Sequence, residues 1–178
     1  MKRALTFALV LGLAGIVRAA DKPFNASLTP DIAIQPTSAT VSGLTLSIWG
    51  QNQQHSLAIG FVNGTSGDSS GLCIGLVNYG DKYTGVQWGI VNHEKGDFLG
   101  WQSAAVNYTD GMFTGFQSGW INYAGNLNGF QLGLVNIADQ AKAALQIGLV
   151  NIIQQNTMWF RELPDALAPG MVIANWRF

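Results

Sequence analysis

A unit of eight residues recurs along most of this chain, and no other feature limits its fold as strongly. The unit reads "GFQLGLVN" at residues 129–136 and "ALQIGLVN" at residues 144–151, and each copy ends in asparagine. Successive asparagines lie 14 or 15 residues apart. Such a near-constant period indicates a chain built from equivalent structural units. The seven asparagines are Asn63, Asn78, Asn92, Asn107, Asn122, Asn136 and Asn151.

Two kinds of side chain alternate within each copy. In residues 129–136, Gln131 and Gly133 fall on one face, and Leu132 and Leu134 fall on the other. This period of two is typical of a β-strand, and the frequent glycine and β-branched residues exclude a helix. Short stretches rich in glycine and aspartate separate the copies, as tight turns require. Each period therefore predicts one strand and one turn.

Charged residues are missing from the repeats. The seven copies cover 56 positions without Asp, Glu, Lys or Arg, although 11% of the chain is charged and about six charges would be expected there. A sheet that faces water normally carries charge on that face. We therefore expect the large apolar face to meet lipid and the small polar face to line a lumen, as in membrane barrels. The glutamines expected to face this lumen are Gln87, Gln102, Gln117, Gln131 and Gln146.

The sequence thus predicts an all-β protein, an antiparallel membrane β-barrel of about ten strands built from seven repeats of 14–15 residues. Residues 24–35 and 39–50 supply two strands before the repeats. A final strand ends on an aromatic residue, Phe178, as in bacterial outer-membrane barrels, and the resulting count is even.

A parallel β-solenoid is the alternative fold. In it the apolar face would point inward, and the asparagines would stack as a ladder. The near-constant period favours this alternative, because the inner and outer turns of an antiparallel barrel usually differ in length.

The first residues predict export. Lys2 and Arg3 precede an apolar stretch, and residues 1–19 have the pattern of a secretory signal peptide. Residues 20–178 then form a single repeat-built β domain, with the repeats at 56–151 and a closing strand at 168–178. We expect the outer membrane or the cell surface of a Gram-negative-type bacterium.

No catalytic, cofactor-binding or metal-binding residue is predicted. Cys73 takes a position that glutamine fills in other copies and has no evident base. His93 and Glu94 are expected to be a solvated pair in a turn. A net charge of −1 gives no basis for binding nucleic acid. Four aspartates in successive turns are expected to be solvated, although stacked turns could gather them around a cation; they are Asp68, Asp81, Asp97 and Asp110.

The repeat "GLxIGLVN", the lead-in "SLTPDIAIQPT" and "VSGLTLSIWG", and the ending "NWRF" resemble a family of bacterial surface repeat proteins. Leptospiral and Bacteroidetes-type proteins full of "GLQIGLIN" units typify this family. The resemblance covers residues 25–178 and implies an exported surface or outer-membrane protein without catalytic residues.

Two functions follow from the two folds. The first is a non-enzymatic outer-membrane or surface β-repeat protein, structural or a narrow, plugged barrel. Its partners would be the lipid bilayer of the outer membrane and the barrel-insertion machinery. The alternative is a secreted, soluble solenoid that binds a protein partner or a glycan through its repeat face, using Trp88, Trp101, Phe116 and Trp120.

Overall fold

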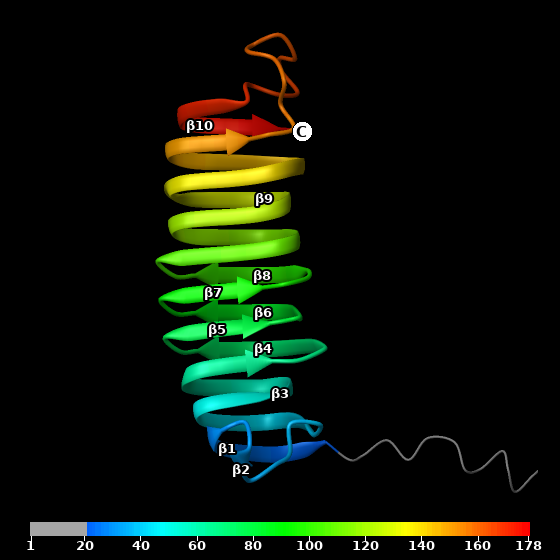
Figure 1. Cartoon of the computed structure of the whole chain (residues 1–178). Helices are drawn as coiled ribbons and strands as arrows, with labels where there is room; N and C mark the ends of the chain where they lie inside the picture. Colours follow the sequence, from blue (N-terminus) through cyan, green and yellow to red (C-terminus); the bar gives the residue numbers. More distant parts are fainter. Residues whose placement is uncertain (1–20) are drawn as a thin grey trace, which may run out of the picture.

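In the computed structural model, which describes residues 21–178, the chain winds into a parallel β-solenoid (Figure 1). The predicted signal peptide, residues 1–19, lies outside the described residues. No helix among the described residues could span a membrane. The strands are β1 (Lys22–Thr29), β2 (Ile32–Ala33), β3 (Thr40–Thr65), β4 (Asp68–Ile74), β5 (Val77–Gly80), β6 (Lys82–Trp88), β7 (Val91–Glu94), β8 (Phe98–Ser103), β9 (Val106–Ile153) and β10 (Gly170–Arg177).

Successive turns of the solenoid stack in register on two faces. On the first face, β4, β6 and β8 run parallel, and Gln87 pairs with Gln102. On the second face, β5, β7 and the start of β9 run parallel, and Asn92 pairs with Asn107. Because the repeat length is nearly constant, each residue type lies above the same type in the previous turn.

The predicted antiparallel barrel is wrong, and the solenoid alternative is confirmed. Neighbouring repeat strands run parallel, and the stack extends from β1 to β10 instead of closing on itself (Figure 1). The side chains nevertheless point as the barrel prediction had them and not as the solenoid alternative did. Gln131 is fully buried, whereas Leu132 and Leu134 are exposed. Parallel in-register strands allow this, because identical amides can then bond to one another inside.

A column of aromatic side chains fills part of the interior, and aliphatic side chains such as Leu127 and Ile153 continue the core. The rings of Tyr83 and Phe98 stack with centroids 6.0 Å apart, and those of Phe98 and Phe113 with centroids 5.5 Å apart. Beside this column, Gly85 adopts a φ of 140°, and a Cβ there would collide with the backbone of the preceding turn. Glycine is therefore required where consecutive turns approach this closely.

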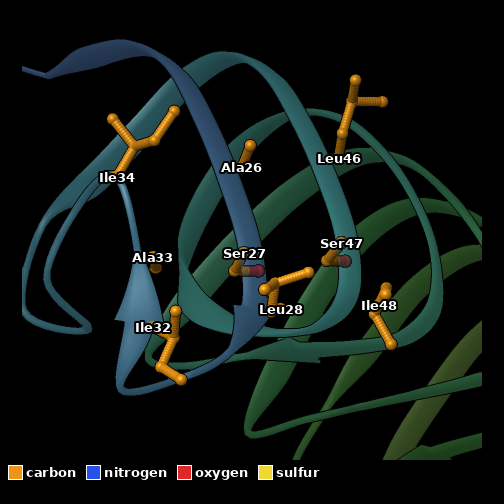
Figure 2. Close-up of a pocket in the computed structure, with 9 residues that line it drawn as sticks. All are labelled: Ala26, Ser27, Leu28, Ile32, Ala33, Ile34, Leu46, Ser47 and Ile48. Atoms are coloured by element: carbon orange, nitrogen blue, oxygen red, sulfur yellow. The ribbon is translucent and has the colours of Figure 1, made fainter.

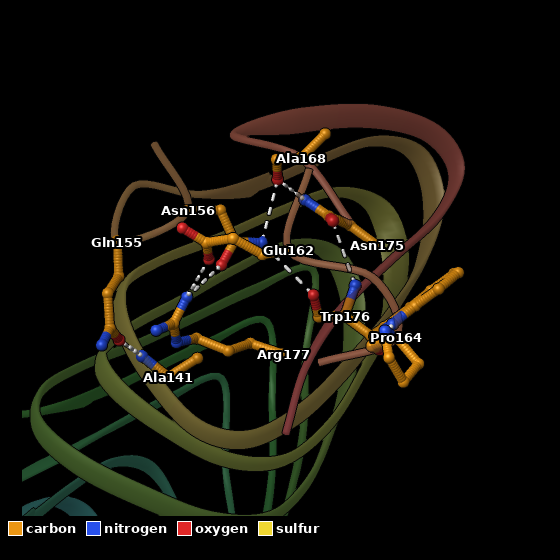
Figure 3. A network of polar contacts seen from close by, with 9 residues as sticks. All are labelled: Ala141, Gln155, Asn156, Glu162, Pro164, Ala168, Asn175, Trp176 and Arg177. Atoms are coloured by element: carbon orange, nitrogen blue, oxygen red, sulfur yellow. Dashed lines mark hydrogen bonds and ion pairs between the residues drawn. The ribbon is translucent and has the colours of Figure 1, made fainter. Parts of the chain in front are cut away.

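Both ends of the stack are capped. The predicted strand 24–35 is in fact a hairpin, because β2 pairs antiparallel with β1. The predicted closing strand is a cap as well, since β10 pairs antiparallel with the last turn of β9. Figure 3 shows the network beneath the C-terminal loop, where Arg177 Nη1 donates to Asn156 Oδ1 at 3.0 Å and to Glu162 Oε2 at 3.3 Å. Such covered ends limit the addition of further strands.

Candidate binding surface: an apolar ridge along one corner

Each turn changes direction at two corners, and one of them carries a row of exposed apolar side chains. At this corner the last residue of the first face is small, and the side chain of the next residue is usually large and points outward. Trp120 is 68% exposed and Leu149 is 67% exposed. Only Ala105 in this row is small. We call this row the apolar ridge; it consists of Phe61, Leu76, Ile90, Ala105, Trp120, Leu134 and Leu149.

The seven repeat asparagines form a continuous ladder directly inside this corner. Each is fully buried. From Asn63 to Asn136, each Nδ2 donates to the Oδ1 of the asparagine in the next turn at 2.8–2.9 Å. Paired in this way, the amides avoid the cost of burying an unbonded polar group.

The same amides also bond the backbone of the corner. Asn63 Nδ2 donates to Ile74 O at 2.9 Å, and Asn122 Nδ2 donates to Leu132 O at 3.0 Å. The corner glycines leave room for these bonds, since a Cβ on Gly133 would lie 2.6 Å from Asn122 Nδ2. Behind the ridge, the asparagines thus give corner carbonyls a second bond, beside the backbone N–H that already reaches Trp88 O and Ser118 O.

One turn departs from this arrangement. Ala104 stands where the other repeats have a corner glycine. The neighbouring amide of Asn92 donates to Gln87 O at 3.2 Å, and no bond to the corner carbonyl is found among residues 21–178. The extra methyl group accounts for the displaced amide.

Uncharged rows flank the ridge on both faces. Beyond the row on the first face, two residues before Ser118 and Leu132, the rings of Phe116 and Phe130 stack 5.3 Å apart. The flanking side chains are exposed or half-buried. The row on the first face is Ile74, Trp88, Ser103, Ser118, Leu132 and Ile147, and the row on the second face is Val77, Val91, Val106, Ile121, Val135 and Val150.

The apolar surface has one hollow beside the ridge and another at the N-terminal cap. Around Ala105 a hollow of about 610 Å³ lies between the ridge and the first face, with Trp120 at its side. Ser118 Oγ donates to Ser103 Oγ at 3.1 Å in its floor. A second apolar hollow, of about 530 Å³, lies at the N-terminal cap between β1, β2 and β3 (Figure 2). Leu28 and Ile48 line it and extend the exposed apolar surface.

The opposite corner carries the charges. Lys82 Nζ lies 3.8 Å from Asp97 Oδ2, and Lys95 Nζ lies 4.0 Å from Asp81 Oδ1, all with side chains more than half exposed. The successive turns do stack, as a cation site would require. Even so, residues 21–178 contain no group of three His, Cys, Asp or Glu side chains placed to hold a metal.

The predicted lumen glutamines form a second ladder inside the solenoid, buried in each of the five turns. Gln102 Nε2 donates to Gln87 Oε1 at 3.1 Å, and Gln117 Nε2 donates to Gln102 Oε1 at 2.9 Å. These bonds point toward the N-terminus, whereas the asparagine bonds point toward the C-terminus. The ladder continues through Gln131 and Gln146.

Glu94 ends the glutamine ladder. In the next turn toward the N-terminus the glutamine position holds Cys73, so Gln87 Nε2 donates to Glu94 Oε1 at 2.6 Å instead. Glu94 Oε2 has no hydrogen-bond partner within residues 21–178. Burial raises the pKa of the Glu94 carboxyl from 4.5 to about 7, against a smaller opposing effect of the Gln87 bond. Burial also raises the pKa of the Cys73 thiol.

The two candidate acid–base residues are separated. Glu94 points into the interior, while His93 lies outside, with its Nε2 3.5 Å from Asp110 Oδ2. Their alternation along β7 places them on opposite faces of the sheet, so they share no site. The prediction of a solvated pair in a turn is therefore wrong, because both residues lie in β7 and Glu94 is fully buried. The place of Glu94 two residues after Asn92 gives it the same inward direction.

Comparison with family models, curated proteins and solved structures yielded no match to this chain.

Proposed function

We propose that this protein is a non-enzymatic, surface-located solenoid that binds a nonpolar partner through its apolar ridge and flanking rows. The observation that carries the proposal is the run of exposed apolar side chains over seven consecutive turns without a charge in the ridge or its flanks. At a spacing of about 4.8 Å per turn the ridge is about 29 Å long. Monomeric proteins rarely expose continuous apolar patches larger than a few hundred Å², and such patches mark interaction sites.

Two features support a nonpolar partner rather than a glycan. Phe116 and Phe130 stack with an angle of 9° between their planes, so one face of each ring is covered by the other ring. Sugar rings need such faces free. The asparagines also already bond the backbone of the corner from inside. The surface therefore presents mainly hydrocarbon groups to a partner.

A non-enzymatic role is supported by the placement of the reactive groups. Cys73 is buried, and its Sγ donates to Asn78 Oδ1 at 3.2 Å. His93 and Glu94 lie on opposite sides of the sheet. The partners expected from the barrel prediction, the bilayer and the insertion machinery, remain predictions.

Site-specific photo-cross-linking in producing cells tests this function. A benzophenone amino acid replaces Trp120 on the ridge or Met112 at the charged corner, two positions with exposed apolar side chains. We expect strong adducts, to lipid or protein, from position 120 and few from position 112. Equal, weak labelling from both positions would refute a binding role for the ridge.

A further inference from the structure

We propose that the partner of the ridge is the hydrocarbon region of one lipid leaflet, with the solenoid axis lying along the membrane surface. The inference rests on the proposed function and names its partner. It starts from the shape of the apolar surface, which is a convex edge and not a flat face or a closed pocket.

The apolar surface covers three sides of the solenoid. In one turn, Leu134 projects from the corner, while Leu132 projects from the first face and Val135 from the second. A rigid protein with a flat surface can cover only one of these sides. Fluid acyl chains can surround all three at once, so the convex shape favours lipid.

The depth of this surface fits half a bilayer. Two or three residues on either side of the ridge, at about 3.3 Å each, give an apolar depth of about 7–10 Å. Half of the hydrocarbon core measures about 15 Å, and helices that lie in the interface are buried about 5–10 Å. The ridge is therefore deep enough to enter one leaflet and too shallow to cross both.

The backbone of the ridge also meets the requirement that hydrocarbon imposes. Every buried polar group must find its partner within the protein. Asn78 Nδ2 donates to Trp88 O at 3.0 Å, and Asn107 Nδ2 donates to Ser118 O at 2.9 Å. The backbone amides of the ridge bond between turns, as Ile90 N does to Leu76 O at 2.8 Å.

Tyrosines lie where the apolar surface gives way to charge. On the second face the rings of Tyr108 and Tyr123 stack 4.4 Å apart, and Tyr123 OH donates to Asp139 Oδ2 at 2.6 Å. Each ring thus extends the apolar face while the hydroxyl reaches the charged corner. Aromatic residues with one polar end favour the boundary between hydrocarbon and water.

Binding to phosphatidylcholine vesicles tests the inference with the full mature chain. Single cysteines replace Trp120 or Met112 and carry an environment-sensitive fluorophore; the buried Cys73 stays unlabelled. We expect vesicles to shift the emission at position 120 to shorter wavelength, and lipids brominated on their acyl chains to quench it. The label at position 112 should keep its spectrum.

Vesicle flotation of unlabelled variants supplies the matched comparison. Trp120→Glu combined with Leu134→Glu should reduce the bound fraction at least about tenfold, while Met112→Glu should leave it unchanged. Circular dichroism verifies that each variant is folded, and both ridge residues point outward. Absence of wild-type binding, or equal loss in both variants, would overturn the lipid assignment. Photo-adducts from position 120 to protein alone would overturn it too, while leaving the binding function intact.

Discussion

The apolar corner and the charged corner both reverse the chain, but among residues 21–178 a ladder of buried asparagine amides runs from turn to turn only behind the apolar corner. There, Asn122 bonds to two neighbouring asparagines and to a backbone carbonyl. At the charged corner, Ser69 Oγ makes an isolated inner bond, donating to Ser66 O at 2.9 Å, and the charged groups bond outside, where Asp97 accepts from Met112 N at 2.9 Å and faces Lys82 in water. A corner whose polar groups are hydrogen-bonded inside the protein can expose hydrocarbon side chains. A corner whose charged groups bond at the surface needs water around it.

The largest expected effect comes from breaking the asparagine ladder. Asn122→Ala leaves Asn136 Oδ1 without its side-chain donor and one N–H of Asn107 Nδ2 without its acceptor, in the dry interior. We expect the free energy of unfolding to fall by about 4 kcal/mol, at 1–3 kcal/mol for each buried group left unpaired. Urea denaturation followed by circular dichroism measures it. Asn128→Ala, in the same turn but on the outer surface, is the control and should cost under about 0.5 kcal/mol; similar losses in both would contradict the role of the ladder.

Among residues 21–178, Glu94 is the fully buried carboxylate, and it makes stability depend on pH. Its pKa is higher in the folded chain, about 7, than the ordinary value of 4.5, so the folded state binds the proton more tightly. Stability is therefore greatest below about pH 4.5 and falls as pH rises to about 7, by about 3 kcal/mol. Unfolding curves of wild type and Glu94→Gln between pH 4 and pH 8 measure the difference. An unchanged pH dependence in the variant would rule out Glu94 as its source.

A methyl group at the apolar corner should have an intermediate effect. Gly133→Ala places its Cβ against the carbonyl oxygen of Gly119 in the preceding turn and 2.6 Å from Asn122 Nδ2, so both the backbone and the amide must shift. We expect a loss of about 2 kcal/mol from overpacking, measured by thermal unfolding. Gly67, at the charged corner of an N-terminal turn, is the comparison. A Cβ on Gly67 would meet no atom closer than 3.7 Å, but the φ of 59° at this position adds strain of about 1 kcal/mol to an alanine. A larger loss at Gly67 than at Gly133 would refute the crowding argument.

The smallest effect is expected at the charged corner itself. Lys82→Gln removes an ion pair whose two side chains are more than half exposed. Such pairs contribute little, so stability should change by under about 0.5 kcal/mol, and added salt should change it no further. Denaturation at low and high ionic strength checks this. A loss above 1 kcal/mol would mean that the outer bonds matter as much as the inner ones.

Much of the fold could be predicted because alternation fixes which face each side chain joins. Gln131 inward and Leu132 outward both follow from period two. The direction of the strands could not be read from alternation, because parallel and antiparallel strands share that period. The constant spacing of the asparagines did carry the signal for parallel stacking. The charge-free outer face and Phe178 favoured a barrel instead, because exposed hydrocarbon is expected to be covered by lipid.

The candidate surface was only partly foreseen. The solenoid alternative assigns Trp120 to a binding face, and Trp120 is one of the most exposed residues of the ridge. The bonds from the asparagines to the corner carbonyls could not be predicted, since they depend on the position of one turn above another. The inward direction of Glu94 was available from its distance to Asn92.

The ladders also bear on how such a chain can change in length. Successive turns are joined by the same side-chain hydrogen bonds. Removal of residues 108–122 would therefore bring Asn107 against Asn136, and the asparagine and glutamine ladders would continue. Recombination between copies in the gene could then shorten or lengthen the rod in steps of about 15 residues, with both end caps kept. The length of the solenoid, rather than its cross-section, is the property that evolution can vary most easily in this molecule.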